Sequence, residues 1–312
     1  MTNSMSSSIT VTNNYNSNAS IPSRNTITKI NIFDFDGTLF ASPQPNRELW
    51  EDPLFGYLKA DTMIFKGWYQ HPKSLSFDEP VIQQGWEGWW NKKIVKLVRQ
   101  SIEQPTSLTV LLTGRGYSGF RHIIAEMVER KDLKFDVMGF KPDKDIIKWN
   151  LFYNPSIIQK VGNTKYEELI CHETLFEFKD NKVTTKEFKY KFINELLFHH
   201  PSVNSIHLWD DRVNHVKSFQ SFFDDLKLRG IVQEATANAV YYPVRYFDPC
   251  KEFLVVQAMI DEHNSEVERF SRQQNELPRK FSLGRLQLVP KQYQYDGWIY
   301  TRYAVQLVDV PF

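Results

Sequence analysis

The sequence lacks the features that mark disulfide-rich, membrane-embedded and strongly charged proteins. Only two cysteines occur in 312 residues, Cys171 and Cys250, so we expect no disulfide framework and interpret both as buried free thiols of a reducing compartment. No apolar run reaches the length of a transmembrane helix or of a signal-peptide core, which predicts an intracellular protein, cytoplasmic or nuclear, with no membrane partner. With 38 basic and 37 acidic residues, the net charge of +1 creates no global field that attracts a polyanion.

The first 28 residues contain no acidic side chain, and their apolar residues show no regular period. They are rich in Ser, Asn and Thr and include one arginine. Because such a segment cannot bury enough apolar surface to offset its ordering entropy, residues 1–28 are predicted to be a disordered tail. A mitochondrial presequence also lacks acidic residues, but it is normally richer in arginine, so this alternative has less weight.

Short apolar runs alternate with amphipathic stretches in the rest of the chain. Helical patterns follow three of these runs, at 117–132, 212–230 and 251–274. The runs themselves are predicted strands and lie at 29–33, 107–116, 134–140, 204–211 and 239–246. This alternation is typical of an α/β protein with a Rossmann-like, open parallel sheet that is covered on both faces. Ligands of such sheets bind at the carboxyl ends of the strands.

Two long segments interrupt this alternation, and one follows it. Residues 41–90 are rich in Pro and Trp and are predicted to form a lid, and residues 141–183 form a second insert. Within 68–96, aromatic and lysine side chains could stack bases and contact phosphates, but packing of the lid onto the sheet is the favoured interpretation. Residues 266–312 are predicted to be a C-terminal extension that ends in a small β-pair.

Two aspartates follow the first predicted strand in "KINIFDFDGTLF". Strand geometry places Asp34 and Asp36 on the same face, where two carboxylates repel each other unless a cation lies between them. Mg²⁺ prefers oxygen ligands of this kind. The pair therefore predicts a magnesium site, although an aspartate pair before a glycine is also common in turns and helix caps.

Four motifs, in this order along the chain, resemble those of the haloacid dehalogenase (HAD) superfamily of phosphohydrolases. They are D-x-D-G-T at 34–38, Thr113 in "VLLTGR", Lys189 in "TTKEFKYKFI", and Asp210 with Asp211 in "HLWDDR". Lys186 and Lys191 compete with Lys189 for the third motif. The resemblance predicts a HAD-like phosphatase domain over residues 29–265.

The resemblance also implies a role for each acidic residue. Asp34 would be the nucleophile that forms an aspartyl-phosphate, and Asp36 would protonate the leaving group and then activate water. Asp34, the carbonyl of Asp36 and Asp211 would ligate Mg²⁺, with Asp210 acting through water or the lysine. From the residues alone, either Asp210 or Asp211 suits the metal.

The remaining site residues are expected to neutralise and hold the phosphoryl group. Attack on a phosphoryl group requires a metal, a cation and a hydroxyl near the nucleophile, and Lys189 and Thr113 would provide the last two. Gly114 and Arg115 follow Thr113 and are expected to bind the substrate phosphate. An exposed arginine without a function is the alternative for Arg115.

A longer set of segments, among them "SPQPNRELW", "GWW", "FDVMGFKP" and "WDDRVNHV", resembles the fungal HAD domain of Swiss Army Knife RNA repair proteins. This resemblance implies phosphorylated RNA ends as substrate. The chain contains no G-x-x-x-x-G-K-[ST] loop, so end sealing is not expected, and no obligate protein partner is inferred. A small-molecule or phosphoprotein phosphatase and a noncatalytic HAD-fold binding module stay open as alternatives.

Overall fold

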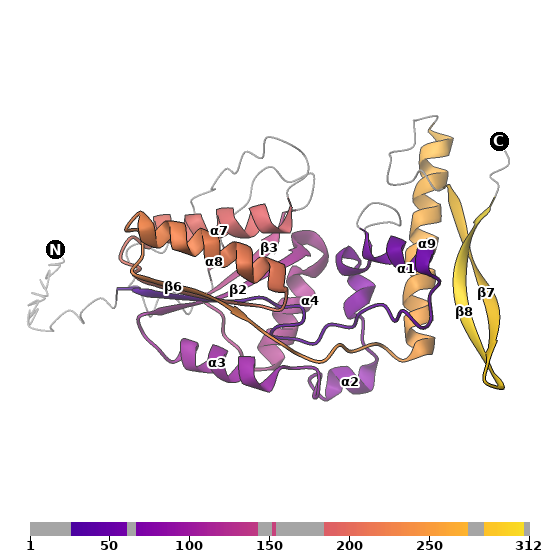
Figure 1. The fold of residues 1–312 in the computed structure, drawn as a ribbon, viewed down its shortest axis with the longest axis horizontal. Helices are drawn as coiled ribbons and strands as arrows, with labels where there is room; N and C mark the ends of the chain where they lie inside the picture. The colour runs from indigo at the N-terminus through magenta and orange to yellow at the C-terminus, as the bar shows by residue number, and fades with distance from the viewer. Residues whose placement is uncertain (1–25, 61–66, 143–151, 154–183, 274–283, 309–312) are drawn as a thin grey trace, which may run out of the picture.

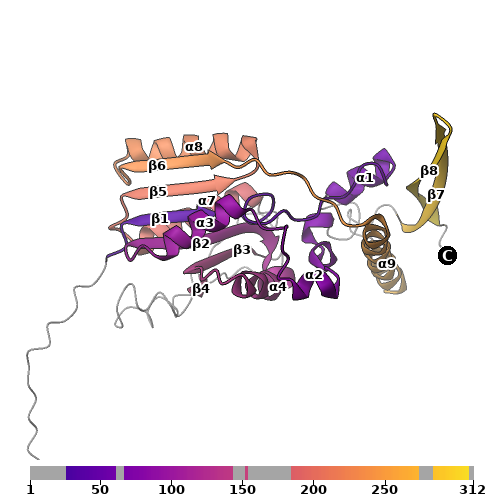
Figure 2. The same cartoon turned by 90° about the horizontal axis from the view of Figure 1, so that it is seen from below.

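A six-stranded sheet forms one end of the protein in a computed structural model, and the C-terminal part of the described chain lies at the other end (Figure 1 and Figure 2). The structure describes residues 26–60, 67–142, 152–153, 184–273 and 284–308. The strand order is β4-β3-β2-β1-β5-β6, and all strands except the antiparallel β4 run parallel. The strands are β1 (Lys29–Phe33), β2 (Ser107–Gly116), β3 (Val137–Lys141), β4 (Phe152–Tyr153), β5 (Ser205–Asp210) and β6 (Glu234–Ala239). The predicted parallel α/β sheet is confirmed.

Helices cover both faces of the sheet because the strands carry apolar side chains on both. In β1, Ile30 and Ile32 pack with α7 (Thr185–His199) and α8 (Val213–Leu228), whereas Phe33 belongs to the core on the opposite face. That second core includes residues from α3 (Lys92–Ile102) and α4 (Tyr117–Arg130). Figure 1 shows α7 and α8 above the sheet and α3 below it.

The described residues of the predicted lid segment, 41–60 and 67–90, pack against the second core. Its elements are α1 (Asp52–Lys59), the 3₁₀ turns η1 (Trp68–Gln70) and η2 (Pro72–Leu75), and α2 (Glu79–Gln83). Trp68, Trp86 and Trp90 are at most 4% exposed, and the Trp68 indole donates to the carbonyl of Pro43 at 2.8 Å. These three rings are inaccessible to a nucleic-acid base, so they pack the lid, as the favoured interpretation of the sequence predicts.

A long helix and a β-hairpin form the C-terminal part of the described chain. Helix α9 (Pro249–Arg272) lies beside β7 (Arg285–Tyr295) and β8 (Trp298–Val308), which pair antiparallel as predicted. The boundary predicted at residue 265 falls inside α9. Glu252 on α9 is buried and accepts hydrogen bonds from the Asn46 amide at 2.5 Å and the Trp50 indole at 2.6 Å. These bonds tie α9 to the lid segment.

The fifth predicted strand, at 239–246, is wrong. The strand that pairs with β5 is β6, five residues earlier, and residues 240–248 belong to no strand. The β6 sequence "EATANA" contains no large apolar residue. This edge strand therefore lacks the apolar run that marks the other strands of the sheet. The aromatic run "VYYPVRY" instead forms an extended connection to α9.

Three further expectations concern the chain outside the sheet. Cys250 is exposed in the first turn of α9, so its interpretation as a buried thiol is wrong, and Cys171 lies outside the described residues. Of the predicted tail, residues 1–25 lie outside the described part, whereas Ile27 is buried and the Thr28 amide donates to the Thr106 carbonyl at 2.9 Å. Most of the 141–183 insert also lies outside the described residues.

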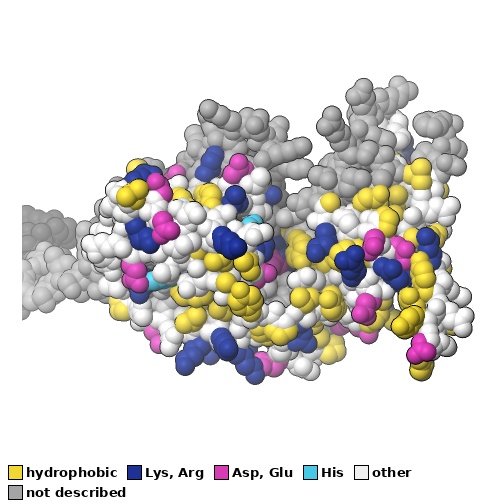
Figure 3. Space-filling view, in the orientation of Figure 1, with side chains coloured by type: hydrophobic (Ala, Val, Ile, Leu, Met, Phe, Trp, Pro, Cys, Tyr) yellow, Lys and Arg dark blue, Asp and Glu magenta, His cyan; other side chains and the backbone are white. Residues whose placement is uncertain are grey.

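Charged side chains of both signs are mixed on the visible surface, as the nearly equal numbers of basic and acidic residues predict (Figure 3). Figure 3 shows basic and acidic side chains interspersed over much of the visible face. Among the described residues, no helix is both long enough and apolar enough to cross a bilayer.

Candidate active site

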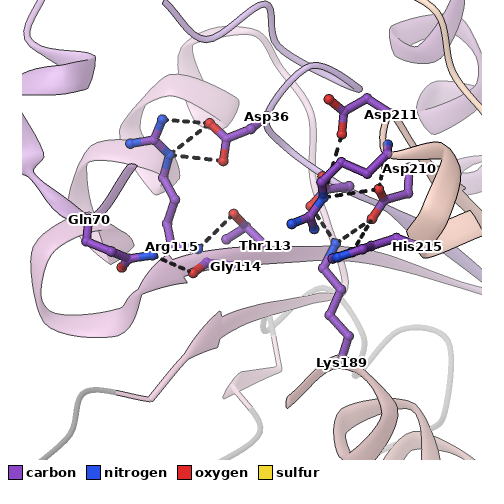
Figure 4. Close-up of polar contacts among 11 residues, drawn as sticks. Asp36, Gln70, Thr113, Gly114, Arg115, Lys189, Asp210, Asp211 and His215 are labelled. Carbon is purple, nitrogen blue, oxygen red and sulfur yellow. Dashed lines mark hydrogen bonds and ion pairs between the residues drawn. The ribbon is translucent and has the colours of Figure 1, made fainter. Parts of the chain in front are cut away.

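The predicted site residues meet at the carboxyl ends of three neighbouring strands. Parallel register places Phe33 of β1 beside Leu111 of β2 and Trp209 of β5, so the residues that follow each strand emerge at one edge of the sheet. The Asp34 amide continues this pairing by donating to the Trp209 carbonyl at 2.9 Å. Figure 4 shows the side chains at this edge in two groups, one around Lys189 and one around Arg115.

Lys189 joins two of the aspartates. Its ammonium nitrogen Nζ lies 2.7 Å from Asp34 Oδ1 and 2.8 Å from Asp210 Oδ2, and all three side chains are buried. A capping box, formed by Thr184 and Glu187, begins α7 and thereby sets the position of Lys189 in its first turns. Of the three competing lysines, the structure brings Lys189 to the aspartates and leaves Lys186 exposed.

Three carboxylates form a candidate metal site. Oxygen atoms of Asp34, Asp210 and Asp211 all lie within 4.8 Å of one another. Burial, together with the charge of Asp210, raises the pKa of Asp34 to about 6 despite the opposing effect of Lys189. Burial and the charges of Asp34 and Asp210 raise the pKa of Asp211 to about 7. Negative charge is therefore in excess where these carboxylates meet.

Asp210 differs from its two neighbours. Although burial alone would raise its pKa, Lys189 and Arg212 outweigh that effect and lower the pKa of Asp210 to about 2. The Arg212 amide also donates to Asp210 Oδ1 at 2.9 Å. The His215 ring nitrogen Nδ1 lies 4.0 Å from Asp210, and burial and Arg212 lower the pKa of this histidine to about 4. Lys189 and Arg212 thus favour the ionised form of Asp210.

The turn after β1 fits a divalent cation at the three carboxylates. Gly37 has a φ of +69°, and a Cβ at this position would overlap the carboxylate of Asp211. Glycine therefore lets Asp211 approach the β1 turn. The donor set is all oxygen, with carboxylates whose mutual repulsion a divalent cation would relieve, and this is the chemistry that Mg²⁺ prefers.

The Asp36 side chain lies outside this cluster and is bound by Arg115. Asp36 Oδ1 accepts from Arg115 Nε at 2.8 Å and from Nη2 at 2.6 Å, and Arg115 Nη1 donates to Ser74 Oγ at 2.7 Å. Burial would raise the pKa of Asp36, but the Arg115 guanidinium outweighs it and lowers the pKa. Arg115 is 1% exposed, so the alternative of an exposed arginine is wrong.

The carboxyl-terminal end of β2, residues 113–116, is held by the lid segment. The Thr113 hydroxyl is buried and accepts from the Arg115 amide at 3.2 Å. Gln70 Nε2 donates to the Gly114 carbonyl at 3.0 Å, and Gln70 Oε1 accepts from the Gly116 amide at 3.1 Å. Sequence reasoning missed Gln70, because no local pattern links this glutamine to Gly114, which lies 44 positions later in the chain.

A hollow of about 410 Å³ opens over these residues and is called the catalytic hollow below. Of the predicted residues, Thr113, Lys189 and Asp210 are buried and are absent from its lining, whereas the lining includes Asp34, Asp36, Gly114, Arg115 and Asp211. Gly37, which also lines the hollow, belongs to the D-x-D-G-T motif. The lining residues that sequence reasoning missed are Ser42, Gln44, Lys59, Tyr69, Gln70, Thr185 and Arg212. Arg212 alone carried a signal, since it directly follows the acidic pair.

One family model matches most of this chain, and two known proteins are similar to it. The family model described as HAD domain family 1 in Swiss Army Knife RNA repair proteins matches residues 42–265. An uncharacterized protein of Saccharomyces cerevisiae, YMR265C, is 26% identical over 276 residues, which are 86% of this chain and 50% of that protein. The chain thus spans about half the length of this relative. The HAD domain of the effector protein Lem4 from Legionella pneumophila aligns over 75% of this chain and 96% of its own, at 12% identity and a TM-score of 0.34.

Proposed function

Since this chain belongs to HAD domain family 1 of Swiss Army Knife RNA repair proteins, we propose that it is a Mg²⁺-dependent phosphohydrolase of phosphate monoesters. One observation carries the proposal: Asp34 lies at the end of β1 beside a buried lysine and two further aspartates. Because carboxylates outnumber cations here, the site suits a metal and a phosphoryl group together.

The proposed reaction has two steps on Asp34. In the first, an Asp34 oxygen attacks phosphorus, the bond to the leaving oxygen breaks, and that oxygen takes a proton from Asp36. In the second, water attacks phosphorus, gives a proton to Asp36, and inorganic phosphate leaves as Asp34 regains its carboxylate. Lys189 holds Asp34 and Asp210 in place and offsets their charge in both steps.

Arg115 influences which of these two proton transfers is easier. Its ion pair favours the carboxylate form of Asp36, which accepts a proton from water. Donation requires the protonated form, which the ion pair disfavours. We therefore expect acyl and aryl phosphates, whose leaving groups need little protonation, to react faster than alkyl phosphates.

Mg²⁺ would be held by Asp34, Asp211 and the backbone carbonyl of Asp36, with Asp210 supporting the site through Lys189. When bound, it supplies positive charge that neutralises the phosphoryl oxygens.

The description of the family favours phosphorylated RNA ends as the substrate. A panel of substrates tests both parts of the proposal. It should contain acetyl phosphate, p-nitrophenyl phosphate, nucleoside monophosphates, a phosphopeptide, and RNA and DNA oligonucleotides with a 5′- or 3′-phosphate. We expect turnover with Mg²⁺, none in EDTA, and, among the alkyl phosphate esters, the highest kcat/KM on RNA oligonucleotides. Turnover in EDTA would refute the metal, a preference for another alkyl phosphate ester would refute RNA ends, and absence of all turnover would identify a noncatalytic HAD-fold module.

A further inference from the structure

A second hollow of about 450 Å³ adjoins the catalytic hollow and is called the side hollow below. The two share four lining residues: Gly37, Ser42, Gln44 and Asp211. The outer wall of the side hollow is formed by residues 240–245, the start of the connection from β6 to α9. Both volumes are typical of sites that enclose a small organic group. The side hollow therefore lies where the part of a substrate next to its phosphate would be.

Backbone hydrogen bonds hold this wall at both ends, and a side-chain hydrogen bond holds its middle. The Val240 amide donates to the Asp210 carbonyl at 3.0 Å, and the Arg245 carbonyl accepts from the Gln44 amide at 2.9 Å. Between them, the Tyr242 hydroxyl donates to the Trp90 carbonyl at 3.2 Å. The wall is thus attached to the active-site strand β5 and, at Gln44 and Trp90, to both ends of the lid segment.

Tyr241 is the large side chain that this wall presents to solvent. It lines the side hollow and is 81% exposed, whereas the tryptophans Trp68, Trp86 and Trp90 are buried. Figure 3 shows a group of hydrophobic side chains over the connection between β6 and α9. An aromatic ring on a fixed backbone loses little conformational entropy when another ring stacks on it.

Two lysines of α3 lie near the wall that residues 240–245 form. Trp90, whose carbonyl binds Tyr242, also lines a third hollow together with Lys92 and Lys96 of α3. Both lysines are exposed, and Figure 3 shows a group of basic side chains below the hydrophobic group on the same face. A catalytic hollow, an exposed aromatic ring and a group of lysines in succession match the phosphate, base and backbone of a nucleic-acid strand.

We propose that Tyr241 stacks on the terminal base of a single-stranded nucleic acid whose end phosphate lies in the catalytic hollow. Lys92 and Lys96 then contact backbone phosphates farther along the strand. This inference rests on the proposed function for the position of the end phosphate. A phosphoserine or phosphothreonine peptide has no ring beside its phosphate, and a phosphotyrosine peptide has no regular row of backbone charges, so the two features together favour a nucleic acid over a peptide.

Binding without turnover tests the inference separately from catalysis. The full chain with Asp34→Asn is titrated, in Mg²⁺, into fluorescein-labelled oligonucleotides of about eight nucleotides, a length within the site sizes of single-strand binding proteins. RNA and DNA are compared, each with a 5′- or a 3′-phosphate. Tyr241→Ala should weaken binding about 5- to 150-fold, the range that stacking of a base on an aromatic side chain supplies. Tyr241→Phe should retain binding, because it keeps the ring.

Tyr295→Ala is the matched control, since Tyr295 is 76% exposed but lies on the C-terminal hairpin, and we expect it to bind as tightly as the parent. Lys92→Glu with Lys96→Glu should lower the slope of log Kd against log salt by about 1.4, which corresponds to two phosphate contacts on a single strand. Lys217→Glu with Lys291→Glu, at exposed sites on α8 and β7, should leave that slope unchanged.

Each outcome separates this inference from the proposed function. Failure of Tyr241→Ala to weaken binding, or equal weakening for a phosphopeptide of the same charge, would overturn the stacking role whatever the protein hydrolyses. Undetectable binding of every oligonucleotide would overturn it as well. Selective weakening in a chain that shows no turnover on any phosphate ester would support the inference and refute the proposed hydrolase.

Discussion

The two ionic groups at the edge of the sheet differ in their balance of charge. Around Lys189, the carboxylates of Asp34, Asp210 and Asp211 outnumber the cations Lys189 and Arg212, and the pKa values of Asp34 and Asp211 are raised. Around Arg115, one guanidinium matches the single carboxylate of Asp36, whose pKa is lowered. The first group has an excess of negative charge that a metal can offset, whereas the second holds one carboxylate in its ionised form (Figure 4).

The largest expected effect comes from the nucleophile in the group with excess charge. Asp34→Asn keeps the size of the side chain but removes the attacking oxygen anion, so the rate on acetyl phosphate in saturating Mg²⁺ should fall roughly 1,000-fold or more. Asp224→Asn, an exposed aspartate on α8, should keep the parental rate. Thermal unfolding verifies that both variants fold, and a folded Asp34→Asn protein with normal turnover would refute the nucleophile.

Asp36 is the carboxylate of the group around Arg115, where positive and negative charge balance. Its removal should affect the proton transfers of the reaction and leave the attack of Asp34 intact. Asp36→Asn should slow hydrolysis about 10²- to 10⁴-fold, because water then lacks its general base. Attack on acetyl phosphate needs no proton donor, so the phosphorylated enzyme should accumulate and be detectable by intact mass after an acid quench. Loss of turnover without any accumulation would show that Asp36 acts before the first step, and would remove this distinction between the two groups.

The buried cation of the first group should dominate stability. Lys189→Met leaves Asp34 and Asp210 buried without their shared partner, and the loss in free energy of unfolding should be about 3–5 kcal/mol. Lys186→Met, on the exposed side of the same helix, should change it by less than about 0.5 kcal/mol. Urea denaturation measures both. Equal losses in the two variants would mean that the ion pairs of Lys189 contribute no stability.

Loss of the cation in the balanced group should cost less. Asp36 keeps 21% of its side chain exposed, so water can solvate its carboxylate after Arg115→Met, and we expect a loss of about 1–3 kcal/mol. Arg229→Met, whose partner Asp225 is exposed, should cost less than about 0.5 kcal/mol. A loss as large as that of Lys189→Met would contradict the role assigned to solvent at Asp36.

The smallest expected effect is the stabilisation of the fold by Mg²⁺, which would offset the excess negative charge around Lys189. At a Mg²⁺ concentration ten times its Kd, the free energy of unfolding should rise by about 1.4 kcal/mol, measured as a shift of thermal unfolding. Asp211→Asn should abolish most of this shift because it removes a ligand, whereas Asp225→Asn on α8 should retain it. The same shift in both variants would place the metal elsewhere.

Sequence reasoning succeeded where a structural feature depends on neighbouring residues. The strands β1, β2, β3 and β5 were recognised from their local patterns, whereas the two-residue strand β4 was not predicted. Parallel pairing of β1 with β2 and β5 then brought Asp34, Thr113 and Asp211 to the same edge. The edge strand β6 escaped recognition because its small side chains do not form such a pattern. The aromatic stretch after it was mistaken for a strand, since composition alone does not distinguish a pleated strand from an extended connection.

The sequence by itself determined the class of the sheet and the set of acidic residues at its edge, because strand periodicity and the order of motifs are properties of short segments. Only the tertiary structure decided which partner each residue has. Arg115 binds Asp36 across 79 positions, and Lys189 binds Asp34 across 155, and no local pattern specifies contacts of that separation. They depend on how the lid segment, α7 and the β6–α9 connection pack around the sheet. That packing also leaves Tyr241 exposed and buries Trp68, Trp86 and Trp90 of the lid segment.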